Sequence, residues 1–135
     1  PIMFRWKGKI EPKMDTTSLV SSIDLVPTAL ELNGLQPTEK MHGINVLDES
    51  ELANRETIFG EIYAHDFSTV DSSIYYRIAI TNPYKLILPD VENKPVEEIM
   101  LFNLWEDPYE KENLAEEKPK VVNELKKKLE EFWQK

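Results

Sequence analysis

Four polar side chains between residues 61 and 66 could act on a ligand. Glu61, Tyr63, His65 and Asp66 bring two carboxylates, a phenol and an imidazole to the end of an expected strand and the loop after it. Carboxylates and imidazoles exchange protons, and all four groups make hydrogen bonds. Because binding residues are common on loops, we predict that this group contacts a substrate. A solvated connection between two strands would have the same composition.

Asp24 and the two histidines are the other candidates for chemistry. Asp24 falls within an expected helix, where capping the N-terminus is a simpler role than catalysis. His42 and His65 lack the i, i+4 spacing of a helical zinc site, and the chain has no cysteine. We recognise no serine-centred nucleophile motif, phosphate-binding glycine loop or carboxylate dyad. The sequence therefore predicts no catalytic residue and no metal site in this chain.

The composition indicates a folded, acidic chain. Of 135 residues, 41% are hydrophobic and 13 are aromatic, which is enough for a packed core. The 16 basic and 25 acidic residues give a net charge of −9, which disfavours nucleic acid as a partner. No apolar run approaches the roughly 20 residues of a membrane span. We therefore expect neither nucleic-acid binding nor a membrane span, and the compartment is not revealed.

Residues 1–50 are expected to form a strand, a core helix and a turn. Residues 2–6 are apolar and aromatic, as in a buried strand. Residues 21–34 follow as a helix with Ser22 or Asp24 as its cap, and its apolar positions predict that it is mostly buried. The polar residues 48–55 place a boundary near residue 50.

Residues 51–135 are expected to form an antiparallel sheet of about four strands covered by a helix. Apolar and β-branched runs predict strands at 57–63, 74–80, 84–88 and 99–104. Pro119 opens a helix whose apolar residues recur every three or four positions. The fold class is therefore α+β: an antiparallel C-terminal sheet packed by an amphipathic helix and preceded by a strand and a helix.

Several segments, in this order, resemble the C-terminal part of a sulfatase, of the arylsulfatase type within the alkaline-phosphatase-like superfamily. The helix carries D-L-V-P-T, the turn after it H-G-I-N, and the end of the sheet L-F-N-L followed by D-P and N-L. Lys7 and Asn45 stand where many members have proline and serine. The segments that carry the resemblance are residues 1–10, 22–34, 42–45, 77–88 and 101–114.

The resemblance implies a longer parent enzyme that hydrolyses sulfate esters. In this family a formylglycine, made from cysteine or serine, attacks sulfur beside a bound calcium ion. The formylglycine motif and the metal ligands lie upstream in the family, so none is transferred to a residue here. Residues 1–50 would end the α/β catalytic domain and residues 51–135 would form the C-terminal subdomain. The chain, which opens on Pro1, reads as a piece of a longer protein, and a periplasmic or secreted parent is compatible with the resemblance.

We therefore predict a C-terminal fragment of a sulfuric ester hydrolase that is catalytically incomplete by itself. Its partners would be the remainder of the catalytic domain and a sulfated small molecule or sugar. The negative charge of the residues at 61–66 suits the leaving-group end of the substrate better than the sulfate. Two alternatives stay open: a related phosphodiesterase, phosphonate hydrolase or phosphomutase, and a non-enzymatic binding module.

Overall fold

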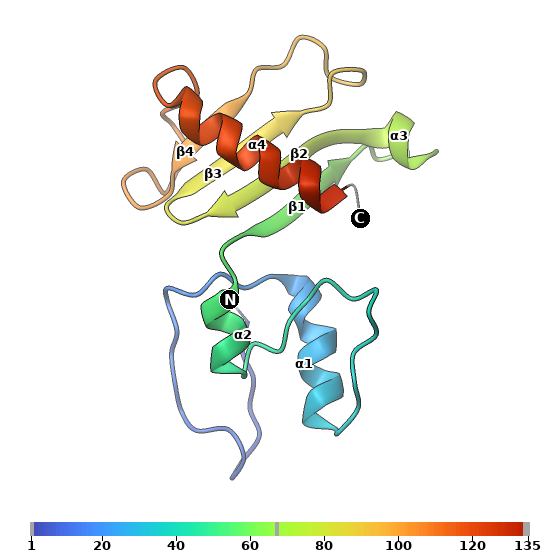
Figure 1. The fold of residues 1–135 in the computed structure, drawn as a ribbon, viewed down its shortest axis with the longest axis vertical. Coiled ribbons are helices and arrows are strands. Elements are labelled where there is room, and N and C mark those ends of the chain that lie inside the picture. Colours follow the sequence, from blue (N-terminus) through green and yellow to red (C-terminus); the bar gives the residue numbers. More distant parts are fainter. Residues whose placement is uncertain (1, 67, 134–135) are drawn as a thin grey trace. The chain divides into compact units, whose positions relative to one another are not determined.

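The computed structural model describes residues 2–66 and 68–133, and the chain forms two compact units, Pro1–Arg55 and Glu56–Lys135. The first unit contains helices and loops, and the second contains a sheet with a long helix (Figure 1). The boundary expected at residue 50 falls within a helix of the first unit. That this unit ends a catalytic domain remains a prediction.

The second unit is a four-stranded antiparallel sheet with one long helix lying across it (Figure 1). Neighbouring strands in the chain are neighbours in the sheet, in the order β1-β2-β3-β4. This arrangement confirms the expected α+β fold. The elements are β1 (Ile58–Tyr63), β2 (Ile74–Thr81), β3 (Tyr84–Pro89), β4 (Met100–Asn103) and α4 (Pro119–Trp133).

The core of this unit lies between the sheet and α4. The register pairs Phe59 with Ala79, Ala79 with Leu86, and Leu86 with Leu101, so one row of side chains crosses all four strands. Because side chains alternate between the faces of a strand, this row shares one face. The fully buried residues that meet there are Ala79, Leu86, Leu101, Val122, Leu125 and Leu129.

A short helix interrupts the connection between β1 and β2, where the sequence predicted only a polar loop. This helix, α3, spans Val70–Ser73. The side chain of Thr69 accepts a hydrogen bond from the Ser72 amide, which satisfies a donor at the start of the helix. A single turn is too short to give the apolar periodicity that identifies longer helices.

The first unit contains the 3-10 helix η1 (Ser22–Asp24) and the α-helix α1 (Leu25–Leu32), followed by α2 (Glu49–Asn54). The strand predicted at residues 2–6 is absent. A strand needs a neighbouring strand for its backbone hydrogen bonds, and no described part of this unit supplies one. The apolar composition of residues 2–6 was therefore not sufficient to predict a strand.

The end of α1 is as expected, and its beginning agrees with one of the two predicted caps. Gly34 has a φ of +74° and donates to Glu31 O, and Leu35 donates to Leu30 O, which closes the helix with a left-handed glycine. Of the two predicted caps, Asp24 is the N-cap residue of α1, although its side chain makes no capping hydrogen bond there, and Ser22 lies within η1. Ser21 precedes the helical segment, and the Asp24 carboxylate reaches back to accept from its amide at 2.7 Å.

The expected burial of α1 is wrong. The buried side chains are Asp24, at the end of η1, and Pro27 and Thr28 of α1, whereas the apolar Leu25 and Val26 are exposed. The polar residues have hydrogen-bond partners within the unit, so burying them is not penalised. Hydrophobic periodicity identified the helix correctly but assigned the wrong face to the interior.

Candidate functional site

Glu61 is the centre of a polar cluster formed by β1, β2 and the end of α4. It lies opposite Arg77 in the register of β1 and β2. The Tyr63 hydroxyl donates to Glu61 Oε2 at 2.5 Å, and Trp133 Nε1 donates to Oε1. Arg77 Nε lies 4.0 Å from the same Oε1. Both carboxylate oxygens of Glu61 are therefore engaged by neighbouring side chains.

Arg77 lies between two carboxylates. One terminal guanidinium nitrogen is 3.7 Å from Asp90 Oδ2, and Nε is 4.0 Å from Glu61 Oε1. Arg77 Nε is buried and makes no hydrogen bond with the described residues. The guanidinium therefore neutralises two acids at longer than hydrogen-bond range, which links β2 to β1 and to the end of β3.

The Tyr63 hydroxyl is a hydrogen-bond donor throughout the physiological pH range. Its hydrogen bond to Glu61, together with burial and the negative charge of Glu61, raises the pKa of Tyr63 to about 12. The phenol therefore remains protonated and neutral, and it does not act as a base. Tyr63 holds the Glu61 carboxylate in place at the end of β1.

The four residues predicted to bind substrate divide into two pairs. Glu61 and Tyr63 are half-buried and hydrogen-bonded to each other, whereas His65 and Asp66 are exposed in the bend after β1. The structure therefore does not bring all four into one buried cluster. The sequence prediction missed Arg77 and Trp133 as partners of Glu61, because neither is close to it in the chain.

Asp24 has a structural environment rather than that of a catalytic base. It is 1% exposed, and Arg55 donates to both of its oxygens at 2.5 and 2.8 Å. The Ile44 and Ser21 amides donate to the same carboxylate. Burial raises the pKa of Asp24, but the Arg55 and backbone hydrogen bonds outweigh it and hold that pKa below its usual value.

Arg55 was not identified from the sequence, although one signal pointed to it. It is the only Lys or Arg between Lys40 and Arg77. Its side chain is 8% exposed, and a buried guanidinium requires a paired carboxylate. The pair connects the start of α1 to the end of the first unit.

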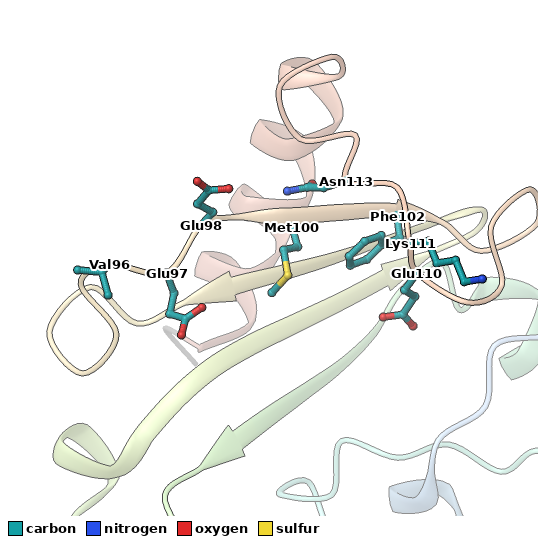
Figure 2. Close-up of a pocket in the computed structure, with 8 residues that line it drawn as sticks. All are labelled: Val96, Glu97, Glu98, Met100, Phe102, Glu110, Lys111 and Asn113. Atoms are coloured by element: carbon teal, nitrogen blue, oxygen red, sulfur yellow. The ribbon is translucent and has the colours of Figure 1, made fainter.

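A hollow of about 490 Å³ lies beside β4 in the second unit. Figure 2 shows Met100 and Phe102 between two glutamates at one end and Glu110 with Lys111 at the other. The acidic lining would repel a sulfate group, and Glu110 is already paired with Lys85 at 2.7 Å. The complete lining is Val96, Glu97, Glu98, Met100, Phe102, Glu110, Lys111 and Asn113.

The chain can be placed in a family by comparison with known proteins. Residues 1–135 match the family described as N-sulphoglucosamine sulphohydrolase, C-terminal. The chain belongs to this family. It is thus the C-terminal segment of a sulfatase, as its motifs and its sheet-and-helix fold indicated.

Similar proteins agree with this assignment. Arylsulfatase K of Xenopus laevis is 26% identical over 127 residues, covering 90% of this chain and 23% of that protein. Arylsulfatase K of Bos taurus is 28% identical over 134 residues, covering 96% and 24%. A Bacteroides thetaiotaomicron structure, described under the metabolism of multiple glycosaminoglycans, is 29% identical with a TM-score of 0.70. The alignment with that structure covers 90% of this chain and 28% of the other. The sulfatase segment spans about a quarter of the length of the curated relatives it matches.

The D-L-V-P-T motif of the sulfatase segment ties α1 to the H-G-I-N turn. The Thr28 hydroxyl accepts from the Val46 amide at 3.0 Å and donates to Ile44 O at 3.3 Å. At Gly43, an added Cβ would lie 2.2 Å from Ile23 O, so only glycine fits there. These motif residues therefore set the close approach of two backbones.

The motif at the end of the sheet closes the outer edge of β4. Asn113 Oδ1 accepts from the Leu101 amide at 2.9 Å, and Asn113 Nδ2 donates to Ile99 O at 3.1 Å. The Leu114 amide donates to Leu101 O at 2.8 Å. We refer to these contacts of Asn113 and Leu114 as the Asn113 clip. They occupy backbone groups that an additional strand would otherwise use.

The described residues do not fit the calcium ion implied for a sulfatase. They contain no group of three or more His, Asp or Glu side chains that could hold a metal. Cysteine is absent from the chain, and no serine is followed by the x-P-x-R residues of a formylglycine motif. None of the described helices is both long and apolar enough for a membrane crossing.

Proposed function

We propose that the polypeptide containing this segment hydrolyses sulfate esters of a sulfated saccharide. The family match over residues 1–135 carries the proposal, because the family description names a sulphohydrolase of N-sulphoglucosamine. The similarity to a structure described under glycosaminoglycan metabolism supports the same substrate class. In this proposal the segment completes the fold and contributes one wall of the substrate cleft.

Formylglycine and calcium would be provided by the remainder of the polypeptide. Hydrolysis of a sulfate ester requires stabilisation of charge on the sulfate oxygens, which a metal ion and positioned cations supply. With its net charge of −9, the present chain is poorly suited to bind the sulfate itself. Its contribution would be to the saccharide rather than to the reacting sulfur.

The bend after β1 is the part of the segment that we propose contacts the saccharide. His65 and Asp66 are exposed there, and an imidazole and a carboxylate can hydrogen-bond to sugar hydroxyls. Glu61 and Tyr63 are held by each other and by Trp133, so they would position the bend. This division of roles follows from which side chains still have polar atoms facing solvent.

The activity is tested on the complete polypeptide. We expect calcium-dependent release of sulfate from an aryl sulfate and from sulfated glycosaminoglycan disaccharides. A polypeptide that released phosphate from an aryl phosphate but no sulfate from any of these esters would contradict the proposal. So would a polypeptide inactive on every ester while correctly folded and carrying formylglycine.

The contribution of the bend is tested with His65→Ala in the complete polypeptide. We expect a higher KM for a sulfated oligosaccharide and nearly unchanged kinetics with a small aryl sulfate, which is too short to reach the bend. His42→Ala, which removes the other exposed histidine, is the matched control. Equal losses on both substrates, or no loss on either, would refute substrate binding by His65.

A further inference from the structure

The helix α1 turns a polar face inward and an apolar face outward, the reverse of a typical surface helix. The inward side of η1 and α1 carries the buried Asp24, Pro27 and Thr28 and the half-buried Glu31. Asp24 and Thr28 bond to residues 44–46, and Glu31 accepts from Asn45 Nδ2 at 2.7 Å. Polar contacts thus join this helical segment to residues 44–46.

The opposite side of the helical segment is apolar and exposed. Ile23, Leu25 and Val26 are 49%, 43% and 55% exposed, and Ala29 is exposed as well. The spacings from 23 to 26, 26 to 29 and 25 to 29 are three or four residues, which puts these side chains on one helical face. We call Ile23, Leu25, Val26 and Ala29 the outer face of α1.

An apolar outer face beside a polar inner face requires an apolar partner. Contact with water at these positions is unfavourable, because apolar surface is stabilised when it is removed from water. Within the described part of the first unit, the inward side of the helix is already occupied by hydrogen-bonded groups. Rotating the helix to bury the outer face would leave Asp24 and Thr28 without their partners.

We propose that the outer face of α1 is the surface on which the remainder of the sulfatase polypeptide packs. This inference rests on the proposed function only in taking the chain as one part of a longer sulfatase. The segment spans about a quarter of the relatives' length, so most of the polypeptide is available as the partner. The partner surface would be apolar, because the outer face carries no charged or hydrogen-bonding side chain.

The charge of the segment argues against two other partners, an anionic lipid surface and a second copy of the chain. Residues 14–39 contain no Lys or Arg, so the region lacks the cations that attach an apolar helix face to anionic lipid. A second copy of the chain would bring together two molecules of net charge −9.

The proposal is tested by hydroxyl-radical footprinting of the complete polypeptide. Corrected for intrinsic reactivity, Leu25 and Val26 should be oxidised about fivefold more slowly than Val91, as expected for buried against exposed side chains. Val91 is 80% exposed and serves as the internal reference. Oxidation of Leu25 and Val26 at the rate of Val91 would overturn the proposal.

A matched pair of variants provides a second measurement. Val26→Asp should lower the thermal unfolding midpoint of the complete polypeptide by several degrees, because a carboxylate would be buried without a partner. Val91→Asp should leave the midpoint unchanged. Equal shifts in both variants would overturn the proposal, and so would protection of Val26 that disappears on dilution to the monomer, which would identify a second copy as the partner.

Neither measurement depends on catalysis. An inactive polypeptide with a protected outer face would contradict the proposed function and leave this inference intact. An active sulfatase whose outer face is oxidised at the rate of Val91 would leave the proposed function intact and contradict this inference.

Discussion

At the scale of single residues, the Asp24–Arg55 pair dominates the first unit. An acid in a D-x-x-P-T motif could be mistaken for a catalytic group, but this one has four hydrogen bonds and is nearly inaccessible. Removing one partner of such a pair leaves the other charge buried and unpaired. This lowers stability more than replacing both partners by apolar residues would. We therefore expect the loss of one partner to reduce the unfolding free energy substantially.

Asp24→Asn should reduce the unfolding free energy by about 3–5 kcal/mol, because Arg55 would remain buried without a counter-charge. Asp66→Asn, at an exposed position, should change it by less than about 0.5 kcal/mol. Urea denaturation of both variants gives the comparison. Similar values for the two would show that the ion pair does not hold the unit together.

The same pair predicts an acid dependence. Because the folded-state pKa of Asp24 lies below the unfolded value of 3.8, its contribution to stability is complete above that pH. The contribution is lost as the pH falls through the lower folded-state pKa. Asp24→Asn should therefore flatten the decline in unfolding free energy below pH 4, measured by urea denaturation at successive pH values.

Tyr63 predicts an alkaline dependence of the opposite sign. Its pKa is raised to about 12 from 10.0, so its stabilising effect is complete below pH 10 and is lost as the pH rises through 12. Ultraviolet titration of the phenolates should show one late component that Tyr63→Phe removes. Tyr109→Phe, at a 79% exposed position, should leave the late component in place.

The candidate site could be predicted only where its residues are neighbours in the sequence. Glu61 and Tyr63 belong to one strand, so their proximity was visible in the alternation of that strand. Trp133 reaches Glu61 from 72 residues away, and Arg55 reaches Asp24 from 31. Contacts at such separations depend on how the elements pack, which local pattern does not reveal.

At the scale of elements, α4 and β1 are joined by aromatic contacts as well as by Glu61. Phe59 stacks on Phe132 with ring centroids 4.2 Å apart, and it meets Trp133 edge-on at 5.9 Å. Trp133 also donates to Glu61. The last turn of α4 is thus fixed to the edge of the sheet by both packing and hydrogen bonding.

Trp133→Ala should therefore lower the unfolding free energy by about 2–4 kcal/mol, less than for a fully buried tryptophan because this side chain is half-buried. Trp105→Ala, at a 71% exposed position, should be nearly neutral. Chemical denaturation followed by circular dichroism measures both. An unchanged midpoint for Trp133→Ala would mean that α4 is not packed as described.

Element prediction succeeded where a segment finds its partners inside the chain. The hairpin of β2 and β3 and the helix α4 were predicted because their alternating or three-to-four-residue patterns match the sheet and helix they pack on. Residues 2–6 and α1 differ from prediction because their apolar groups have no apolar partner among the described residues of their unit. The pattern states that a face is apolar, but it does not state which neighbour covers it.

At the scale of the whole molecule, the described residues contain no group of three or more His, Asp or Glu side chains that could hold a metal, and the sequence carries no formylglycine motif. Purified residues 1–135 should therefore show no calcium-dependent turnover of an aryl sulfate. The complete polypeptide assayed alongside provides the positive control. Turnover by the segment alone would place the nucleophile within it and contradict the assignment of catalysis to the remainder.

The Asn113 clip also affects how copies of the sheet could join to one another. A sheet with two open edges can add strands on both sides and grow into a filament, whereas a sheet with one can pair only once. Because Asn113 and Leu114 occupy the outer edge of β4, strand addition is confined to β1, the opposite edge of the described sheet. The Asn113 clip thus leaves one edge of the described sheet, rather than two, for pairing with another copy.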